Sequence, residues 1–290
     1  LGIIGGGQLG SLLAVAAKKL NIQTTIYCDD INAPAQNFCD NFIYGKYDDK
    51  SKIKELIKVV DIITYEFENI PYETLNDINL SKPVLPKPSI NKLIQHRISE
   101  KDFINKLNIR TTRYASIESK SDIEPLGDFL PGILKTTTLG YDGKGQYPIK
   151  KIREIESLNL DFSKGYILEK LVKLKKEISV IITRFGNNSY EIYEPIENTH
   201  ENQILKHSII PAEISKKIFN DSKEWSIRIA EELKYIGTLC VEFFIDRNEN
   251  LYVNEIAPRV HNSGHLTINA FNISQFENHV RAVCGLEKIT

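Results

Sequence analysis

Two glutamates lie in the middle of strongly apolar segments near the end of the chain. Glu242 lies within TLCVEFFID and Glu255 within NLYVNEIA, with a short turn at 247–250 between them. An antiparallel hairpin of these segments could bring both carboxylates onto one face. Carboxylates side by side repel each other unless a divalent cation lies between them, and Mg²⁺ combines such oxygens with nucleotide phosphates. The pair therefore predicts a metal and nucleotide site, although either glutamate alone would suggest an exposed sheet edge.

A polar loop, PRVHNSGH, follows the second segment and contains Arg259, His261 and His265. A loop this dense in polar groups is a candidate for function, and a fixed guanidinium suits an oxyanion. The two histidines could instead belong to a zinc site. The sequence has no cysteine or third histidine close to them, which disfavours zinc.

A second glycine-rich stretch, TLGYDGKGQ, occupies positions 138–146. Its backbone N–H groups could close over phosphates, but the spacing is not that of a Walker loop. Asp142-Gly143 is also a good turn dipeptide, so an ordinary hairpin is the alternative. Lys135 in the preceding apolar segment GILKT favours the phosphate interpretation, because burying an ammonium is costly unless an anion meets it.

The chain opens with a third glycine pattern, LGIIGGGQLG. Gly5, Gly7 and Gly10 follow a short apolar strand and lead into a helix, which is the context of a dinucleotide fingerprint. Asp29 and Asp30 end the next strand, near the distance expected of an acid that binds ribose. These residues predict an NAD-type site or another doubly wound domain whose helix N-terminus offers N–H groups to an anion.

Composition narrows the class of protein. The 290 residues carry a net charge of −1 with 26% charged residues, which gives no electrostatic bias toward nucleic acid or a membrane. The sequence has no run of 18 apolar residues and no signal-peptide pattern, so a cytoplasmic location is expected. The four cysteines have no C-x-x-C spacing and are expected to be reduced.

The order of predicted elements changes near position 90. Strands and helices alternate before it, which predicts a parallel sheet between helices. A proline-rich boundary at 83–88 and a helical stretch over about 89–107 follow. From position 111 the strands are mostly adjacent, apart from one long helix near 211–235, and predict antiparallel sheets. The expected class is therefore α/β followed by α+β.

The motifs together resemble a known family. GGGQLG, TYEFENIP, HRISEKDFINKL, GYDGKGQ, ENTH and NEIAPRVHNSGH occur along nearly the whole chain. In this order they resemble the ATP-grasp superfamily and, within it, the N5-carboxyaminoimidazole ribonucleotide synthases of purine biosynthesis. Most ATP-grasp enzymes carry N-E-x-N-P-R where this chain has NEIAPR, and the alanine followed by HNSGH is typical of this one family.

The resemblance implies two domains. A Rossmann-like pre-ATP-grasp domain would span 1–90 and hold a ribonucleotide instead of NAD. An ATP-grasp domain would span 91–290, with a lid-bearing subdomain over about 110–165 and the remainder over about 166–290. The family's small C-terminal domain, which supplies basic residues to the ribonucleotide phosphate, would be missing from this sequence.

The implied reaction joins 5-aminoimidazole ribonucleotide to bicarbonate and converts ATP to ADP and phosphate through carboxyphosphate. ATP and Mg²⁺ would be the cofactors, and the enzyme would be a homodimer that contacts neither nucleic acid nor membrane. Another ATP-grasp ligase, such as a formate-dependent ribonucleotide transformylase, would share the ATP residues. An NAD-dependent oxidoreductase or a non-catalytic nucleotide-binding module would share only the opening loop.

The resemblance also assigns roles to residues. The magnesium ligands would be Glu242 and Glu255. The ATP site would comprise Arg97, Lys135, Gly140, Tyr141, Asp142, Gly143, Lys144, Gly145, Gln146, Glu169, Lys170, Leu171, Val172, Glu177, His200, Asn254 and Glu255. The ribonucleotide and bicarbonate would contact Gln8, Glu66, Tyr141, Arg259 and His261. Asp142, Arg259 and His261 would be catalytic, with Asp142 handling the proton of the amine. Lys144 stands where many relatives have arginine, which would weaken a bidentate contact.

Overall fold

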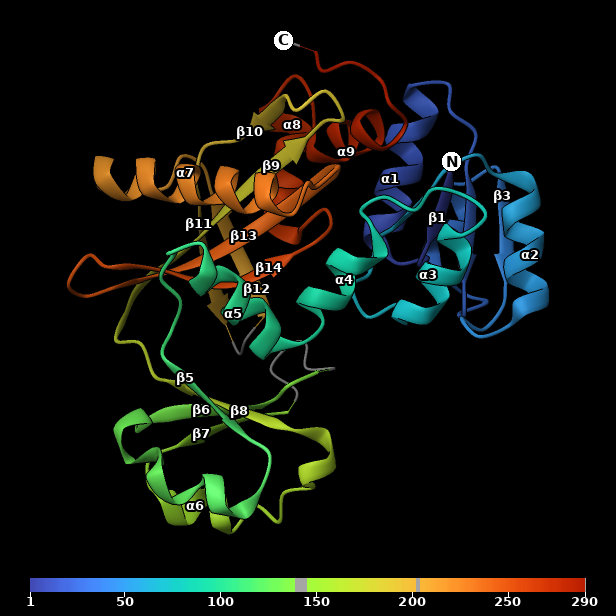
Figure 1. Cartoon of the computed structure of the whole chain (residues 1–290). Coiled ribbons are helices and arrows are strands. Elements are labelled where there is room, and N and C mark those ends of the chain that lie inside the picture. The colour runs from blue at the N-terminus through green and yellow to red at the C-terminus, as the bar shows by residue number, and fades with distance from the viewer. Residues whose placement is uncertain (139–144, 202–203, 290) are drawn as a thin grey trace.

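The computed structural model describes residues 1–138, 145–201 and 204–289, which form three sheets (Figure 1). The first sheet is parallel and the other two are antiparallel. This confirms the predicted change from α/β to α+β along the chain. Among the described helices, none is both long enough and apolar enough to cross a membrane.

The first domain is a four-stranded parallel sheet in the order β3-β2-β1-β4. Its strands are short and mostly buried because helices cover them, which is the usual environment of parallel strands. Its elements are β1 (Gly2–Ile4), α1 (Gln8–Lys19), β2 (Thr25–Cys28), the 3₁₀ helix η1 (Pro34–Asn37), β3 (Asn41–Tyr44), α2 (Lys50–Val59), β4 (Ile63–Tyr65) and α3 (Tyr72–Asn79).

Two helices connect this domain to the rest: α4 (Pro88–Ile94) and α5 (Arg97–Lys106). The helical stretch predicted over about 89–107 is therefore present as two helices, and the break between them was not predicted. His96 takes an extended backbone conformation between them, and its ring accepts the Ser99 N–H as an N-cap. The break places Arg97 at the start of a new helix, where its N–H donates to Thr137 O at 2.9 Å.

A small antiparallel sheet, in the order β5-β8-β6-β7, projects from the body of the molecule (Figure 1). Its own hydrophobic cluster includes Leu134 and Leu168 from the strands and Ile155 from the helix that covers them. The elements are β5 (Tyr114–Ile117), η2 (Lys120–Asp122), η3 (Glu124–Phe129), β6 (Gly132–Thr136), β7 (Gln146–Ile149), α6 (Ile152–Glu156), η4 (Phe162–Lys164) and β8 (Tyr166–Lys170).

The large antiparallel sheet has the order β12-β11-β9-β13-β14, and β10 pairs with β9. One face packs on α5 and α7 through a cluster that includes Ile104, Ile229 and Phe243. The elements are β9 (Leu174–Arg184), β10 (Tyr190–Ile192), β11 (Ile196–Glu201), β12 (Ile204–Ile209), α7 (Lys216–Glu232), β13 (Gly237–Asp246), β14 (Leu251–Ala257), η5 (Asn262–Leu266), α8 (Thr267–Ala270) and α9 (Gln275–Val283).

Helix α9 fastens the large sheet to the first domain. Its residues Phe276 and Val280 share one hydrophobic cluster with Leu13 and Ala17 of α1. The ring of His279 bridges the same interface: its Nδ1 accepts the N–H of Thr238 at 3.0 Å, and its Nε2 lies 2.8 Å from Thr64 Oγ1. Because Nδ1 accepts a bond from a backbone donor, the neutral ring carries its proton on Nε2 and donates to Thr64. Burial lowers the pKa of His279 to about 4.

Protonation of this ring should destabilise the fold in mild acid. The pKa of His279 is depressed in the native state, so its contribution is complete above the unfolded pKa of about 6.5 and is lost as pH falls toward the native pKa of about 4. When the pH is lowered from about 7.5 to about 5, the free energy of unfolding of the wild type should fall by roughly 2 kcal/mol more than that of His279→Gln. Denaturant unfolding at the two pH values measures both. Equal losses in the two proteins would contradict this assignment.

Candidate active site

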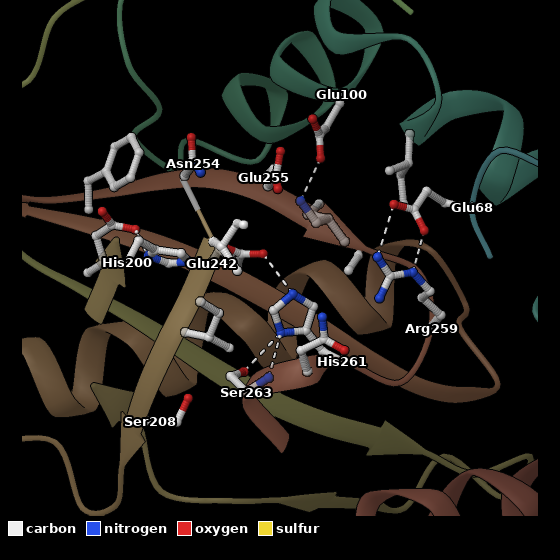
Figure 2. Close-up of a pocket in the computed structure, with 18 of the residues that line it drawn as sticks. Glu68, Glu100, His200, Ser208, Glu242, Asn254, Glu255, Arg259, His261 and Ser263 are labelled. Atoms are coloured by element: carbon white, nitrogen blue, oxygen red, sulfur yellow. Dashed lines mark hydrogen bonds and ion pairs between the residues drawn. The ribbon is translucent and has the colours of Figure 1, made fainter. Parts of the chain in front are cut away.

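A cleft of about 970 Å³ lies where the three sheets and α5 meet. Gln8 enters it from the first domain, and Lys135 and Gln146 enter from the small sheet. Glu68 of the first domain faces a group of polar side chains from the large sheet (Figure 2). The lining residues discussed below are Gln8, Glu68, Arg97, Glu100, Lys135, Gln146, Glu177, His200, Glu242, Asn254, Glu255, Arg259, His261, Ser263 and His265.

The hairpin of β13 and β14 places the two predicted metal ligands opposite each other. Glu242 pairs directly with Glu255 across the ladder, and a register shift follows immediately after Glu242. Facing residues of an antiparallel pair lie on the same side of the sheet, and this side faces the cleft. The predicted juxtaposition of the carboxylates is therefore present.

Each of these carboxylates is paired with a cationic side chain. Glu242 Oε1 lies 2.9 Å from Nε2 of His261, and Glu255 Oε2 lies 3.5 Å from a guanidinium nitrogen of Arg97. Burial opposes ionisation of Glu242, but the charge of His261 outweighs it and lowers the pKa. Enclosure in the cleft and the negative charge of Glu242 raise the pKa of Glu255. Neighbouring positive charge thus offsets the repulsion between the two carboxylates, and a divalent cation between them would offset it further.

The donor set fits magnesium better than zinc. No group of three or more His, Cys, Asp or Glu side chains able to hold a metal occurs within residues 1–138, 145–201 and 204–289. Mg²⁺ is commonly held by one or two carboxylates and completes its shell with phosphate oxygens and water. Glu242 and Glu255 therefore suit a magnesium ion that arrives with a nucleotide.

Positive charge lines the opposite part of the cleft. Lys135 Nζ on β6 lies 3.1 Å from Glu169 Oε1 on β8, and Arg97 begins α5 beside Glu255. Burial opposes ionisation of Glu169, yet Lys101 and Lys135 lower its pKa to about 2. Farther along the large sheet, His200 Nδ1 lies 2.9 Å from Glu177 Oε2, and this contact raises the pKa of the imidazole.

Glu68 and Arg259 form the ion pair that connects the first domain to this cleft. The guanidinium donates to both carboxylate oxygens of Glu68, and the bond from Nη2 to Oε1 is 2.9 Å (Figure 2). The charge of Arg259 lowers the pKa of Glu68 despite burial. Figure 2 shows His261 directed toward Glu242, while Ser263 Oγ lies 2.9 Å from the other ring nitrogen. Arg259 and His261 thus have fixed orientations.

The opening glycine loop already binds an anion from its own chain. The N–H groups of Gly7 and Gly10 donate to the carboxylate of Glu66 at 2.5 and 2.6 Å. The backbone of Gly5 has a φ of 102°, and a Cβ there would lie 2.5 Å from Glu66 Cγ. The glycines are therefore needed for close approach of this carboxylate. Of the two interpretations from the sequence, the NAD-type site fails because these two amides are not available to a dinucleotide pyrophosphate.

The predicted ATP-site and substrate-site residues do not all line the cleft. Those in the lining named above lie together in the cleft, whereas Glu66 lies behind the glycine loop. Positions 169–172 comprise the end of β8 and the first residues after it, where the N–H groups of Lys170 and Leu171 donate to Arg113 O and Pro131 O. Gly145 has a φ of 71° at the start of β7. Gly140, Tyr141, Asp142, Gly143 and Lys144 lie outside the described residues.

Glu68, Glu100 and Ser263 are among the cleft residues that were not predicted from the sequence. Glu68 lies two residues after Glu66, so the same motif contained the side chain that reaches the cleft. Glu100 follows Arg97 by three positions and shares its helical face, which was a usable signal. It accepts the N–H of Ile256 at 2.6 Å, and burial and the nearby Glu255 raise its pKa to about 8. Ser263 had no signal of its own.

Family comparisons agree with this geometry. Residues 102–276 match the ATP-grasp domain, and residues 1–95 match the ribonucleotide synthetase preATP-grasp domain. Fold and site therefore define an ATP-grasp protein preceded by the domain found in ribonucleotide synthetases.

Individual relatives narrow this class. The chain is 40% identical over 290 residues to the N5-carboxyaminoimidazole ribonucleotide synthase of Bacillus subtilis, covering 99% of this chain and 76% of the relative. The Brucella melitensis enzyme of the same name is 39% identical over 291 residues, covering 99% and 80%. The chain belongs to the N5-carboxyaminoimidazole ribonucleotide synthase family.

Solved structures give the same result. The Staphylococcus aureus N5-carboxyaminoimidazole synthetase complexed with ADP superposes with a TM-score of 0.94 at 38% identity, covering 99% of this chain and 78% of that one. The Aspergillus clavatus enzyme in complex with ADP and 5-aminoimidazole ribonucleotide has a TM-score of 0.90 at 26% identity, covering 99% and 77%.

The glycine loop gives a stability prediction. Gly5→Ala should lower the free energy of unfolding by about 2 kcal/mol or more, because the positive φ and the contact with Glu66 are both unfavourable. Gly127→Ala is the matched control, since a Cβ there meets nothing within 4 Å, and it should change stability by at most about 0.5 kcal/mol. Denaturant unfolding measures both, and similar effects of the two substitutions would refute the role assigned to Gly5.

Proposed function

We propose that this cleft is where ATP and bicarbonate carboxylate 5-aminoimidazole ribonucleotide. The chain is an ATP-grasp ligase of its family, and the product is N5-carboxyaminoimidazole ribonucleotide. One observation carries the location of the reaction: the paired carboxylates Glu242 and Glu255 face the same cleft as Lys135 and Arg97. A carboxylate pair and two cationic side chains around one space suit a magnesium-bound triphosphate.

Lys135 and Arg97 bind the phosphates of ATP, and Glu177 with His200 binds the nucleoside end. Glu242 and Glu255 hold Mg²⁺, which when bound stabilises the charge that develops on the transferred phosphoryl group. When Mg²⁺ is bound at these carboxylates, His261 gives up its place beside Glu242 and Arg97 gives up its place beside Glu255. Residues of the 138–146 loop exclude water, since carboxyphosphate hydrolyses readily.

The other end of the cleft binds the two small substrates. Bicarbonate is a poor electrophile, so ATP first phosphorylates it to carboxyphosphate. The amine of the ribonucleotide then captures carboxyphosphate or the CO₂ that it releases. Arg259 and His261 position the oxyanion, because both are held rigidly by Glu68 and Ser263. Asp142 accepts the proton of the amine and Tyr141 contacts the substrate; both lie outside the described residues.

The first domain contributes the ribonucleotide contacts. Gln8 lies at the first position of α1 and lines the cleft, so it reaches the substrate directly. Glu66 acts mainly by holding the amides of the loop that carries Gln8. The ribonucleotide therefore binds on the cleft side of this loop, between Gln8 and Arg259.

Further assignments rest on the family resemblance. The protein is assigned a cytoplasmic location and a homodimeric state. Its metal is assigned as Mg²⁺ and its carbon source as bicarbonate. The segment 169–172 meets adenine through its backbone, and Asn254 lies beside the metal. The domain division is proposed at 90/91, within α4 (Pro88–Ile94).

The direct test is ADP release with magnesium-ATP and bicarbonate, with and without 5-aminoimidazole ribonucleotide. Stimulation by the ribonucleotide supports the proposed reaction. Stimulation only by formate with a different ribonucleotide amine would indicate a transformylase instead. Binding of ATP with no stimulation by any acceptor would refute the proposed substrate site.

Glu255→Gln should lose magnesium-ATP turnover by about 100-fold or more while the protein stays folded, because an amide neither balances the metal's charge nor pairs with Arg97. Glu249→Gln is the control, since that glutamate lies on the turn of the same hairpin and pairs only with exposed Lys175. Steady-state kinetics and thermal unfolding measure both variants. Unchanged turnover in Glu255→Gln would exclude it as a metal ligand.

A further inference from the structure

Lys101 is a buried cation that none of the assignments above uses. It lies on α5, one turn after Arg97, and its side chain is 2% exposed. Its Nζ donates to Thr111 Oγ1 at 3.1 Å and to Thr112 Oγ1 at 3.0 Å, and it lies 3.4 Å from Asn254 O. An ammonium this deeply buried is costly unless its surroundings require it.

The surroundings of Lys101 fix its charge state. The Thr111 hydroxyl donates to Val253 O at 2.9 Å, and the Thr112 hydroxyl donates to Glu169 Oε2 at 3.1 Å. Both hydroxyls therefore present only lone pairs to Nζ. A neutral amine would need a donor for its own lone pair, whereas an ammonium has three donors for these oxygens. Burial lowers the pKa of Lys101 and the negative charge of Glu169 opposes this, and the hydrogen-bond geometry favours the ammonium form.

Glu169 lies between two ammonium groups. Its Oε1 is 3.1 Å from Lys135 Nζ and its Oε2 is 3.5 Å from Lys101 Nζ. The carboxylate is buried, so water screens these charges little. One negative charge thus faces two positive charges, of which only Lys135 lies in the lining of the cleft. Without Lys101, the carboxylate would neutralise Lys135 alone.

We propose that Lys101 is a positioning residue for ATP binding: it balances the charge of Glu169, so that Lys135 keeps its own positive charge for the nucleotide phosphates. The proposal rests on the proposed function, because it takes Lys135 as the phosphate contact. It also explains why a carboxylate can orient Lys135 without weakening its attraction for an anion.

A purely structural role is the competing explanation. Lys101 connects α5 to Thr112 and Glu169 of the small-sheet side and to Asn254 of β14, so its loss could loosen the whole cleft. The two roles predict different effects on the binding of different ligands. Loss of a charge role weakens the binding of phosphate groups alone, whereas a loosened cleft weakens the binding of the nucleoside as well.

The first experiment measures binding of magnesium-ATP by calorimetry and of adenosine by ligand-observed NMR. Lys101→Met keeps the length of the side chain and removes its charge. It should weaken magnesium-ATP binding about tenfold and change adenosine binding by less than about twofold. Arg281→Met is the control, because it removes a half-buried ion pair with Glu277 on α9, outside the cleft lining, and should change neither affinity. Equal weakening of both ligands, or unchanged ATP binding, would overturn the proposal.

The second experiment is a rescue. Lys101→Met combined with Glu169→Gln removes the buried charge pair and leaves Lys135 with its full charge, so ATP affinity should return to within about threefold of the wild type. A structural role predicts a double variant at least as weak as the single one. If Lys101→Met alone does not fold, the double variant still decides: ATP binding more than about tenfold weaker than the wild type refutes the charge role.

The proposed function is tested separately by the wild type. Absence of ribonucleotide-stimulated ADP release would count against the reaction and leave the binding comparison intact. Unchanged ATP affinity in Lys135→Met would remove the phosphate contact on which the role of Lys101 depends.

Discussion

The pairing of Glu242 with Glu255 across β13 and β14 is the constraint on which the site depends. Backbone hydrogen bonds set this register, and a slip of one residue on either strand would turn one carboxylate to the opposite face of the sheet. The opposite face packs on α5 and α7, where a bare carboxylate would be strongly unfavourable. The hydrophobic core of the large sheet therefore enforces the geometry of the carboxylate pair.

Charge in the cleft is organised as pairs that bring different parts of the fold together. Glu68 of the first domain contacts Arg259 after β14, and Arg97 of α5 contacts Glu255. Glu169 joins the small sheet to α5 in the same way. Each of these charges has a partner from another element, as the cost of isolating a buried charge requires.

Local patterns predicted the parts of the site that lie on one hairpin or one strand. The two glutamates of the hairpin and Lys135 could be inferred because an ionisable group in an apolar strand is visible in the sequence. The contacts of Lys101 with Glu169 and of Glu68 with Arg259 could not be inferred, since they form only through the packing of separate elements. The helix break at His96 was missed for a similar reason: a tertiary bond from Arg97 N–H to Thr137 O supports it.

The carboxylate of Glu66 occupies the amides of a loop whose sequence is that of a dinucleotide fingerprint. The acceptor lies 59 positions from Gly7, beyond the window that such a fingerprint covers. A glycine pattern thus specifies a backbone shape, and a distant side chain decides whether that shape is open to a ligand. One acidic residue just after a neighbouring strand therefore holds this turn as an internal structural joint of the parallel sheet.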